Sequence, residues 1–398
     1  MTSTSGQIAT ADDTTTADAA LDQLRRGTTL RWRGDFHNGR QLIKAVDRRL
    51  TKQAARRGKR GKTAPGGQDT AGALFLRQRR ERARRAEVLG RIVVDLGVRE
   101  RAHGDDAPAA PEWFLDLRRA PDIAEACAHA YGAPRPGDSR RIPFTELQGV
   151  LGAWQWHIRG VEVPALGEKV YPDYGVFSPT RSEYVDLVDE VAASRLPQGA
   201  EVMELGTGTG VLAAVLVRRG AGHVTATDVN PGAVSCARLN LDRLGAGERC
   251  GVVAADLWPA APERADVVVF NPPWLPGTPT SELERGVYDA SSDTLRRFLV
   301  ELADHLTDGG EGWLVLSDLA ELLGLRSREQ LERWIGDGGL QVLGREDTVP
   351  RHPAVSGTKG GGADPLRAAR SREVTSLWRL GRARADRPAP GLPRLTRG

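Results

Sequence analysis

A glycine-rich segment and two carboxylates that follow it carry the clearest chemical signal in the sequence. The segment Glu204-Leu205-Gly206-Thr207-Gly208-Thr209-Gly210 follows an apolar stretch, and its glycines allow a sharp turn and close approach of a ligand to the backbone. Amides at the start of the following helix would face that ligand. Asp228 stands where a carboxylate can accept both hydroxyls of a ribose. Asp256 stands where a side chain could meet an adenine amino group, and with Leu257 beside it these residues predict a nucleoside pocket.

A second motif, Asn271-Pro272-Pro273-Trp274, follows the apolar run Val267–Phe270. An amide or aromatic amine nitrogen is a poor nucleophile because its lone pair is delocalised. The side-chain oxygen of Asn271 and the backbone carbonyl of Pro272 can accept its two N–H groups, which favours a pyramidal nitrogen in the transition state. The prolines fix these acceptors, and Trp274 offers a face for a planar group. We interpret the four residues as catalytic, with no metal required; the alternative is a structural chain break.

A doubly wound α/β sheet would bring the two motifs together. Short apolar stretches alternate with helices from Glu201 onward, which predicts a parallel sheet with right-handed crossovers. The first and fourth strands of such a sheet flank the point where strand order reverses, so the glycine segment and Asn271 would face one crevice. The predicted strands are 201–205, 223–228, 251–256, 266–270 and 312–317, with helices at 182–193 and from near 210, 231 and 291.

The remaining segments are assigned from composition and periodicity. Residues 340–345 and 374–380 could close the sheet as an antiparallel pair, and the stretch 349–372 between them is either a mobile lid or disordered. We expect disordered tails at both ends, a basic helical domain, a β-hairpin entry with strands at 153–161 and 168–171, and the seven-stranded α/β domain. The boundaries are 1–20, 21–140, 141–180, 181–382 and 383–398.

Charge and composition limit the partners. The net charge of +4 hides two basic clusters, Arg48–Lys62 and Arg77–Arg85, which could neutralise phosphates or could be solvated helix faces. No run of eighteen apolar residues exists, so no membrane helix is expected. Three cysteines show no C-x-x-C spacing, and the N-terminus has no signal pattern. We expect a cytoplasmic protein with reduced thiols.

The stretch from about Thr145 to Leu380 resembles the class I methyltransferases that use S-adenosyl-L-methionine. Leu147–Gly152 is similar to the entry of the HemK-type protein-glutamine N5-methyltransferases, which modify peptide-chain release factors. Phe177–Glu183 stands where that family has Pro-Arg-Pro-Glu-Thr-Glu, and Gly175–Pro179 is also similar to ribosomal-RNA guanine N2-methyltransferases. Trp274 replaces the usual Tyr, and the Pro-Arg-Pro core is not kept.

The resemblance implies a site for each substrate. By this resemblance the donor S-adenosyl-L-methionine would be held by the residues of the glycine segment and the two carboxylates, with Phe177 and Thr180 at its border. The accepting group would be held by Asn271, Pro272 and Trp274.

Several functions fit these observations. The leading hypothesis is N-methylation of a protein glutamine, with a translation factor as one candidate; its rivals are an exocyclic amino group of an RNA or DNA base and a small planar metabolite. A NAD-dependent oxidoreductase is an alternative from another class, because Gly208-x-Gly210-x-x-Ala213 fits a dinucleotide fingerprint. A non-catalytic nucleic-acid-binding protein would explain the basic clusters alone.

Overall fold

The computed structural model describes residues 7–60, 70–102, 108–260, 264–279, 282–349 and 365–383. Within these ranges the chain forms two compact units. The first consists mainly of residues up to Glu162 together with Lys169–Ser178, and the second covers Val163–Glu168 and most of the chain from Pro179. None of the described helices combines the length and apolar character that a membrane span requires.

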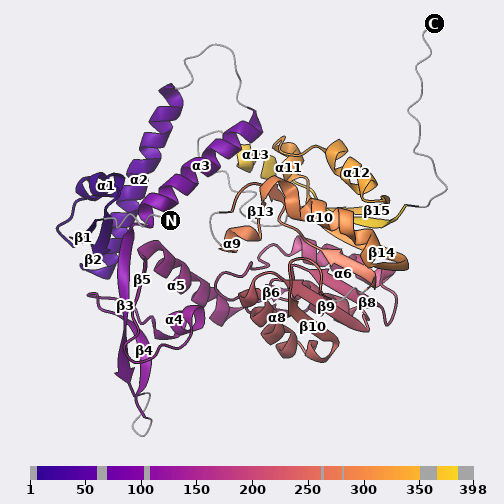
Figure 1. The fold of residues 1–398 in the computed structure, drawn as a ribbon, viewed down its shortest axis with the longest axis horizontal. Coiled ribbons are helices and arrows are strands. Elements are labelled where there is room, and N and C mark those ends of the chain that lie inside the picture. Colours follow the sequence, from indigo (N-terminus) through magenta and orange to yellow (C-terminus); the bar gives the residue numbers. More distant parts are fainter. Residues whose placement is uncertain are drawn as a thin grey trace. The chain divides into compact units, whose positions relative to one another are not determined.

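The second unit is built on the predicted seven-stranded sheet (Figure 1). Its strand order is β10-β9-β8-β11-β14-β16-β15, with order reversing between β8 and β11. The first five strands of that order are parallel, and β16 runs antiparallel to both of its neighbours. The strands are β8 (Glu201–Leu205), β9 (His223–Asp228), β10 (Cys250–Ala254), β11 (Ala265–Phe270), β14 (Leu306–Ser317), β15 (Leu340–Thr348) and β16 (Thr375–Arg382). The doubly wound α/β class and the antiparallel closing pair are therefore confirmed.

Helices cover both faces of this sheet (Figure 1). One group consists of α6, α7 and α8, which pack side by side, and the other contains α10 and α12, which pack on each other. Alternate side chains of β11, Val268 and Phe270, join α10 residues Leu295 and Phe298 in one apolar core. The helices are α6 (Glu183–Arg195), α7 (Val211–Arg218), α8 (Pro231–Arg243), α9 (Glu282–Arg285), α10 (Asp293–Glu301), α11 (Leu319–Leu322), α12 (Arg328–Asp337) and α13 (Pro365–Arg370).

The first unit is not the helical domain that the sequence predicts. It contains a five-stranded sheet in which β1, β2 and β3 are parallel, while β4 and β5 both run antiparallel to β3. The strands are β1 (Ile8–Ala11), β2 (Thr29–Trp32), β3 (Ile92–Arg101), β4 (Ala110–Leu115) and β5 (Arg140–Pro143), and the helices are α1 (Ala17–Arg25), α2 (Phe36–Arg60), α3 (Ala71–Leu89), α4 (Ala124–Tyr131) and α5 (Phe144–Arg159).

Short strands between helices explain this error. Gly27, with φ of +89°, ends the turn after α1, and the alternating burial of Thr29–Trp32 places Leu30 and Trp32 in the core. Helix α3 ends at Gly90, and the β-branched residues Ile92, Val93 and Val94 then start β3. The expected N-terminal tail is also wrong from residue 8 onward, because β1 pairs with β2 and α1 begins at Ala17.

The predicted strand over 153–161 is wrong as well, because most of it belongs to helix α5. The alternation of tryptophans in Trp154-Gln155-Trp156 imitates a strand, but Phe144, Leu147 and Val150 are buried at helical spacing. Gly160, with φ of +68°, ends the helix. The hairpin itself is formed by β6 (Val161–Val163) and β7 (Glu168–Val170). The stretch 350–364 and the tail 384–398 lie outside the described residues.

Candidate active site

The register of the second sheet brings the two motifs to one edge. Leu205 of β8 pairs with Thr227 of β9 and with Phe270 of β11. The residues that follow these three, Gly206, Asp228 and Asn271, therefore lie side by side at the ends of these strands, with neighbouring parallel strands about 4.8 Å apart. This confirms that the glycine segment and the Asn-Pro-Pro-Trp motif share the carboxyl edge where strand order reverses. Ligands of doubly wound sheets bind at this place.

The glycine segment has a backbone that only glycine adopts easily. Gly206, Gly208 and Gly210 have φ values of +66°, +56° and +80°. A Cβ at Gly210 would also lie 3.2 Å from the carbonyl oxygen of Ala237. The segment is fixed to the next strand by the Thr207 N–H, which donates to the Thr227 carbonyl at 2.8 Å. This hydrogen bond ties the turn to β9, and helix α7 begins directly after the turn.

Glu204 lies beneath this turn. Its side chain is almost fully buried, and Oε2 accepts hydrogen bonds from the Thr207 hydroxyl at 2.6 Å and from the Ala213 N–H at 3.1 Å. Burial raises the pKa of Glu204 to about 8, although both hydrogen bonds act to lower it. The carboxyl group thus joins the turn to the first turn of α7, and these contacts assign it a positioning role.

Asp228, the predicted ribose partner, is held at the end of β9 by backbone hydrogen bonds. Its Oδ2 accepts the Gly208 N–H at 3.0 Å and its Oδ1 accepts the Asn230 N–H at 2.8 Å. The backbone N–H of Val229 is a third donor to this carboxylate, and because a carboxylate has about four acceptor sites, the group can still accept a ligand hydroxyl. Burial raises the pKa of Asp228, and the backbone hydrogen bonds oppose that shift. The chemistry of this carboxylate fits a nucleoside.

Asp256 and Leu257 follow β10 at the same edge. Asp256 forms an ion pair with Arg297 at 3.1 Å, and its side chain is 64% exposed. Leu257 is buried with φ of +67°, and its carbonyl accepts the Thr227 hydroxyl at 2.6 Å. The structure therefore places Leu257 firmly next to β9, whereas the carboxylate of Asp256 is engaged at the surface.

The Asn-Pro-Pro-Trp segment has an internal hydrogen bond that the sequence motif does not reveal. The indole Nε1–H of Trp274 donates to Oδ1 of Asn271 at 2.9 Å. An amide oxygen accepts two hydrogen bonds, so Asn271 keeps one acceptor position for a ligand N–H. The segment continues into β12 (Leu275–Pro276), which pairs with β13 (Tyr288–Asp289). Both ends of the loop are therefore fixed.

A buried ionic network next to Trp274 is the part of the site that sequence reasoning missed. The Arg181 guanidinium lies 4.9 Å from the Trp274 ring centroid, and the Tyr184 ring meets the same indole edge-on at 6.5 Å. Arg181 also pairs with Glu183 at 2.6 Å and with Glu373 at 3.1 Å. Both carboxylates have side chains only 1% exposed, and Glu373 accepts the Ser317 hydroxyl at 2.6 Å.

Two further predicted residues fall into different units. Phe177 is half-buried and belongs to the first unit, whereas Thr180 is exposed and belongs to the second. Their assignment to the donor site stays a prediction. The structure brings the glycine segment and the Asn-Pro-Pro-Trp motif to one edge of the sheet. The binding and catalytic roles of their residues stay predictions.

Residues 168–323 match the family model described as "Methyltransferase small domain". The chain is 31% identical over 294 residues to the ribosomal RNA small subunit methyltransferase C of Pseudomonas aeruginosa, a match that covers 69% of this chain and 76% of that protein. It is 32% identical over 193 residues to the release factor glutamine methyltransferase of Mycolicibacterium smegmatis, covering 47% of this chain and 60% of that enzyme's length.

The solved structures to which the chain is similar include an N-methyltransferase from Bradyrhizobium japonicum in complex with S-adenosyl-L-homocysteine. The sequence identity is 14% and the TM-score is 0.35, over 51% of this chain and 88% of that one.

The match to the ribosomal RNA small subunit methyltransferase C of Pseudomonas aeruginosa covers more residues of this chain than the second unit contains. Its similarity therefore extends into the first unit.

Proposed function

Because the chain belongs to the class I methyltransferases that use S-adenosyl-L-methionine, we propose that it methylates an exocyclic amino group of an RNA base at the edge shared by β8 and β11. One observation carries the reaction type. Asn271 leaves the sheet beside Gly206, so an amide acceptor stands next to the glycine turn. A NAD-dependent oxidoreductase would not require an amide side chain at position 271.

The donor, when bound, supplies an activated methyl group on a sulfonium. Asp228 would hold the ribose of the donor, and the turn Gly206–Gly210 would let its backbone approach. Glu204 keeps that turn in place through its bonds to Thr207 and Ala213. These residues bind and orient the donor, and positioning of this kind supplies a large part of the rate of a bimolecular transfer.

Asn271 would act on the accepting nitrogen. The free acceptor position of Asn271 and the carbonyl of Pro272 would accept hydrogen bonds from the two N–H groups of that nitrogen. These bonds favour a pyramidal nitrogen, whose lone pair can then attack the methyl carbon. As the new C–N bond forms, the C–S bond breaks and its electron pair remains on sulfur. The nitrogen then loses one proton to solvent. The Trp274 N–H holds the Asn271 amide in a single orientation throughout, so little reorganisation is needed.

The choice of RNA rests on the first unit. The relative whose similarity extends into that unit is named as a ribosomal RNA methyltransferase. Arg48, Lys52 and Arg56 are exposed and spaced four residues apart on α2, which forms a basic stripe on that helix. Helix α3 packs against α2 and exposes Arg80, Arg82 and Arg84. Basic stripes of this kind bind phosphates along a nucleic acid.

A protein glutamine is the second candidate. The identity of 32% to a release factor glutamine methyltransferase favours it, and the glutamine amide presents the same planar NH2 group. That match covers less than half of this chain and gives no role to the basic stripe.

An experiment with S-adenosyl-L-methionine that carries a tritiated methyl group distinguishes RNA from a protein glutamine as the acceptor. The purified protein is incubated with this donor and either ribosomal RNA or release factors, and the product is digested with nuclease or with protease. RNA methylation predicts label that nuclease alone releases. The triple variant Arg48→Gln, Lys52→Gln and Arg56→Gln should bind RNA with a salt slope lower by about 2–3, with donor affinity unchanged. Label released only by protease would contradict RNA methylation and favour a protein glutamine as the acceptor.

A further inference from the structure

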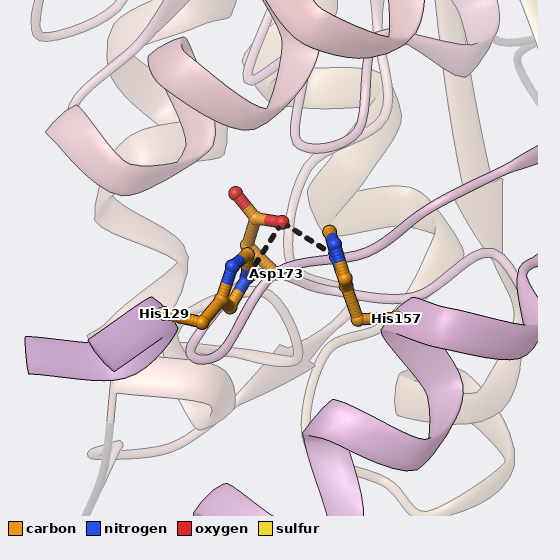
Figure 2. Close-up of side chains that lie close together, drawn as sticks. All are labelled: His129, His157 and Asp173. Carbon is orange, nitrogen blue, oxygen red and sulfur yellow. Dashed lines mark hydrogen bonds and ion pairs between the residues drawn. The ribbon is translucent and has the colours of Figure 1, made fainter. Parts of the chain in front are cut away.

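Three side chains of types that can bind a metal ion meet in the first unit, outside the candidate active site (Figure 2). His129 comes from α4, His157 from α5, and Asp173 from the segment after β7. Asp173 Oδ1 lies 3.0 Å from His129 Nε2 and 3.0 Å from His157 Nδ1. Figure 2 marks contacts from this one oxygen to both imidazole rings, and all three ligand atoms lie within 4.8 Å of one another.

The surroundings hold these rings in place. The indole of Trp154 stacks on the His157 ring at 5.3 Å, with an interplanar angle of 14°, and also contacts the His129 ring at 5.3 Å. The two imidazole centroids are 4.1 Å apart. The side chains of His129, His157 and Asp173 are 22%, 14% and 17% exposed, so the cluster is shielded but open to small solutes. Helices α4 and α5 pack on each other, which fixes the spacing of the histidines.

We propose that His129, His157 and Asp173 bind a divalent transition metal ion, with Zn²⁺ as the first candidate. Two neutral imidazoles and one carboxylate are a ligand set that Zn²⁺ prefers over Mg²⁺ or Ca²⁺. Zinc sits about 2.0–2.1 Å from such ligands, which places tetrahedral ligand atoms roughly 3.3 Å apart. The two 3.0 Å separations from Asp173 Oδ1 are close to that value, and all three ligand atoms lie within 4.8 Å of one another, so small side-chain shifts would admit the ion.

A bound ion would cross-link this part of the first unit. It would link α4, α5 and the segment after β7, which are separate in the sequence. Three protein ligands leave a fourth position for water. The sequence patterns predict no metal because the three residues are far apart and follow no ligand spacing.

The test uses the full chain without an affinity tag, stripped with a chelator. Co²⁺ is titrated as a spectroscopic probe, because a tetrahedral Co²⁺ site has strong visible absorption, and Zn²⁺ is then added. The proposal predicts one equivalent of Co²⁺, its displacement by Zn²⁺, and an upward shift in the thermal unfolding midpoint with Zn²⁺ but not with Mg²⁺. Absence of stoichiometric uptake by the stripped wild type overturns it.

Variants locate the ion. His129→Gln, His157→Gln and Asp173→Asn should each weaken Co²⁺ binding at least about tenfold, and His37→Asn, an exposed histidine on α2, should not. Circular dichroism of the stripped variants checks their folding. Tight binding that survives all three cluster variants would place the ion elsewhere and refute the site. Should a variant fail to fold, the remaining variants and the wild-type stoichiometry still decide.

Discussion

Replacing Glu204 with glutamine should remove a pH dependence of stability that the buried carboxyl group creates. The folded chain keeps the Glu204 proton up to the raised pKa of about 8, whereas the unfolded chain releases it near the ordinary value of 4.5. Between these values the folded state binds more protons than the unfolded state, so stability falls as the pH rises. The contribution of Glu204 is complete below pH 4.5 and is lost as the pH rises through 8.

The size of the effect follows from the shift. One pH unit within this window costs up to about 1.4 kcal/mol. From pH of about 5.5 to about 7.5 the wild type should therefore lose up to about 3 kcal/mol through this group. The glutamine side chain of the variant has no titratable proton but can accept the same hydrogen bonds from Thr207 and Ala213. Relative to wild type, Glu204→Gln should become more stable as the pH rises.

Urea unfolding followed by circular dichroism across this pH range measures the difference. Glu201→Gln is the matched control, because Glu201 is exposed at the start of the same strand. Its stability should run parallel to wild type at every pH. Parallel curves for Glu204→Gln would show that Glu204 ionises normally in the fold, and would refute a protonated carboxyl group beneath the turn.

Three more substitutions test the candidate site, and a fourth tests its glycine turn. Asn271→Ala should lower kcat by about 10²–10³-fold with donor affinity nearly unchanged; equal loss of both would indicate a structural role. Asp228→Ala should weaken donor binding by about 10–150-fold, measured by calorimetry, since hydrogen bonds to a carboxylate are lost. Trp274→Phe removes about 1 kcal/mol of hydrogen bonding to Asn271, so kcat should fall about fivefold, and an unchanged kcat would discount that bond. Gly210→Ala should destabilise the fold by about 1–3 kcal/mol in thermal unfolding; full stability would contradict the strained turn.

The second unit could be predicted well from the sequence because its central strands, such as β8 and β11, are buried on both faces. Val267–Phe270 is a continuous apolar run that ends in Asn271, and the strand predicted there starts within one residue of β11. The glycine turn has an equally local cause, the need for positive φ. Continuous apolar runs that alternate with helices indicate buried strands, and such strands are typical of a parallel sheet.

The first unit and the ionic network could not be predicted in the same way. The strands β1 and β2 have only four residues each, too few for a periodic signal. The alternating tryptophans of α5 imitate a strand, but residues two apart lie on different faces of a helix, and here Trp154 packs against the core while Trp156 is exposed. Arg181 and Glu373 are 192 residues apart, so their pairing depends on the tertiary fold. The His129, His157 and Asp173 cluster has the same origin.

In the proposed reaction, transfer of a methyl group to a planar amino nitrogen depends on Asn271. The most direct measurement is mass spectrometry of the methylated product, hydrolysed to nucleosides or amino acids, from reactions with wild type and Asn271→Ala. The proposed reaction predicts a methyl group on an exocyclic nitrogen with wild type and almost none with the variant. A methyl group on carbon or oxygen, or equal product from both proteins, would contradict it.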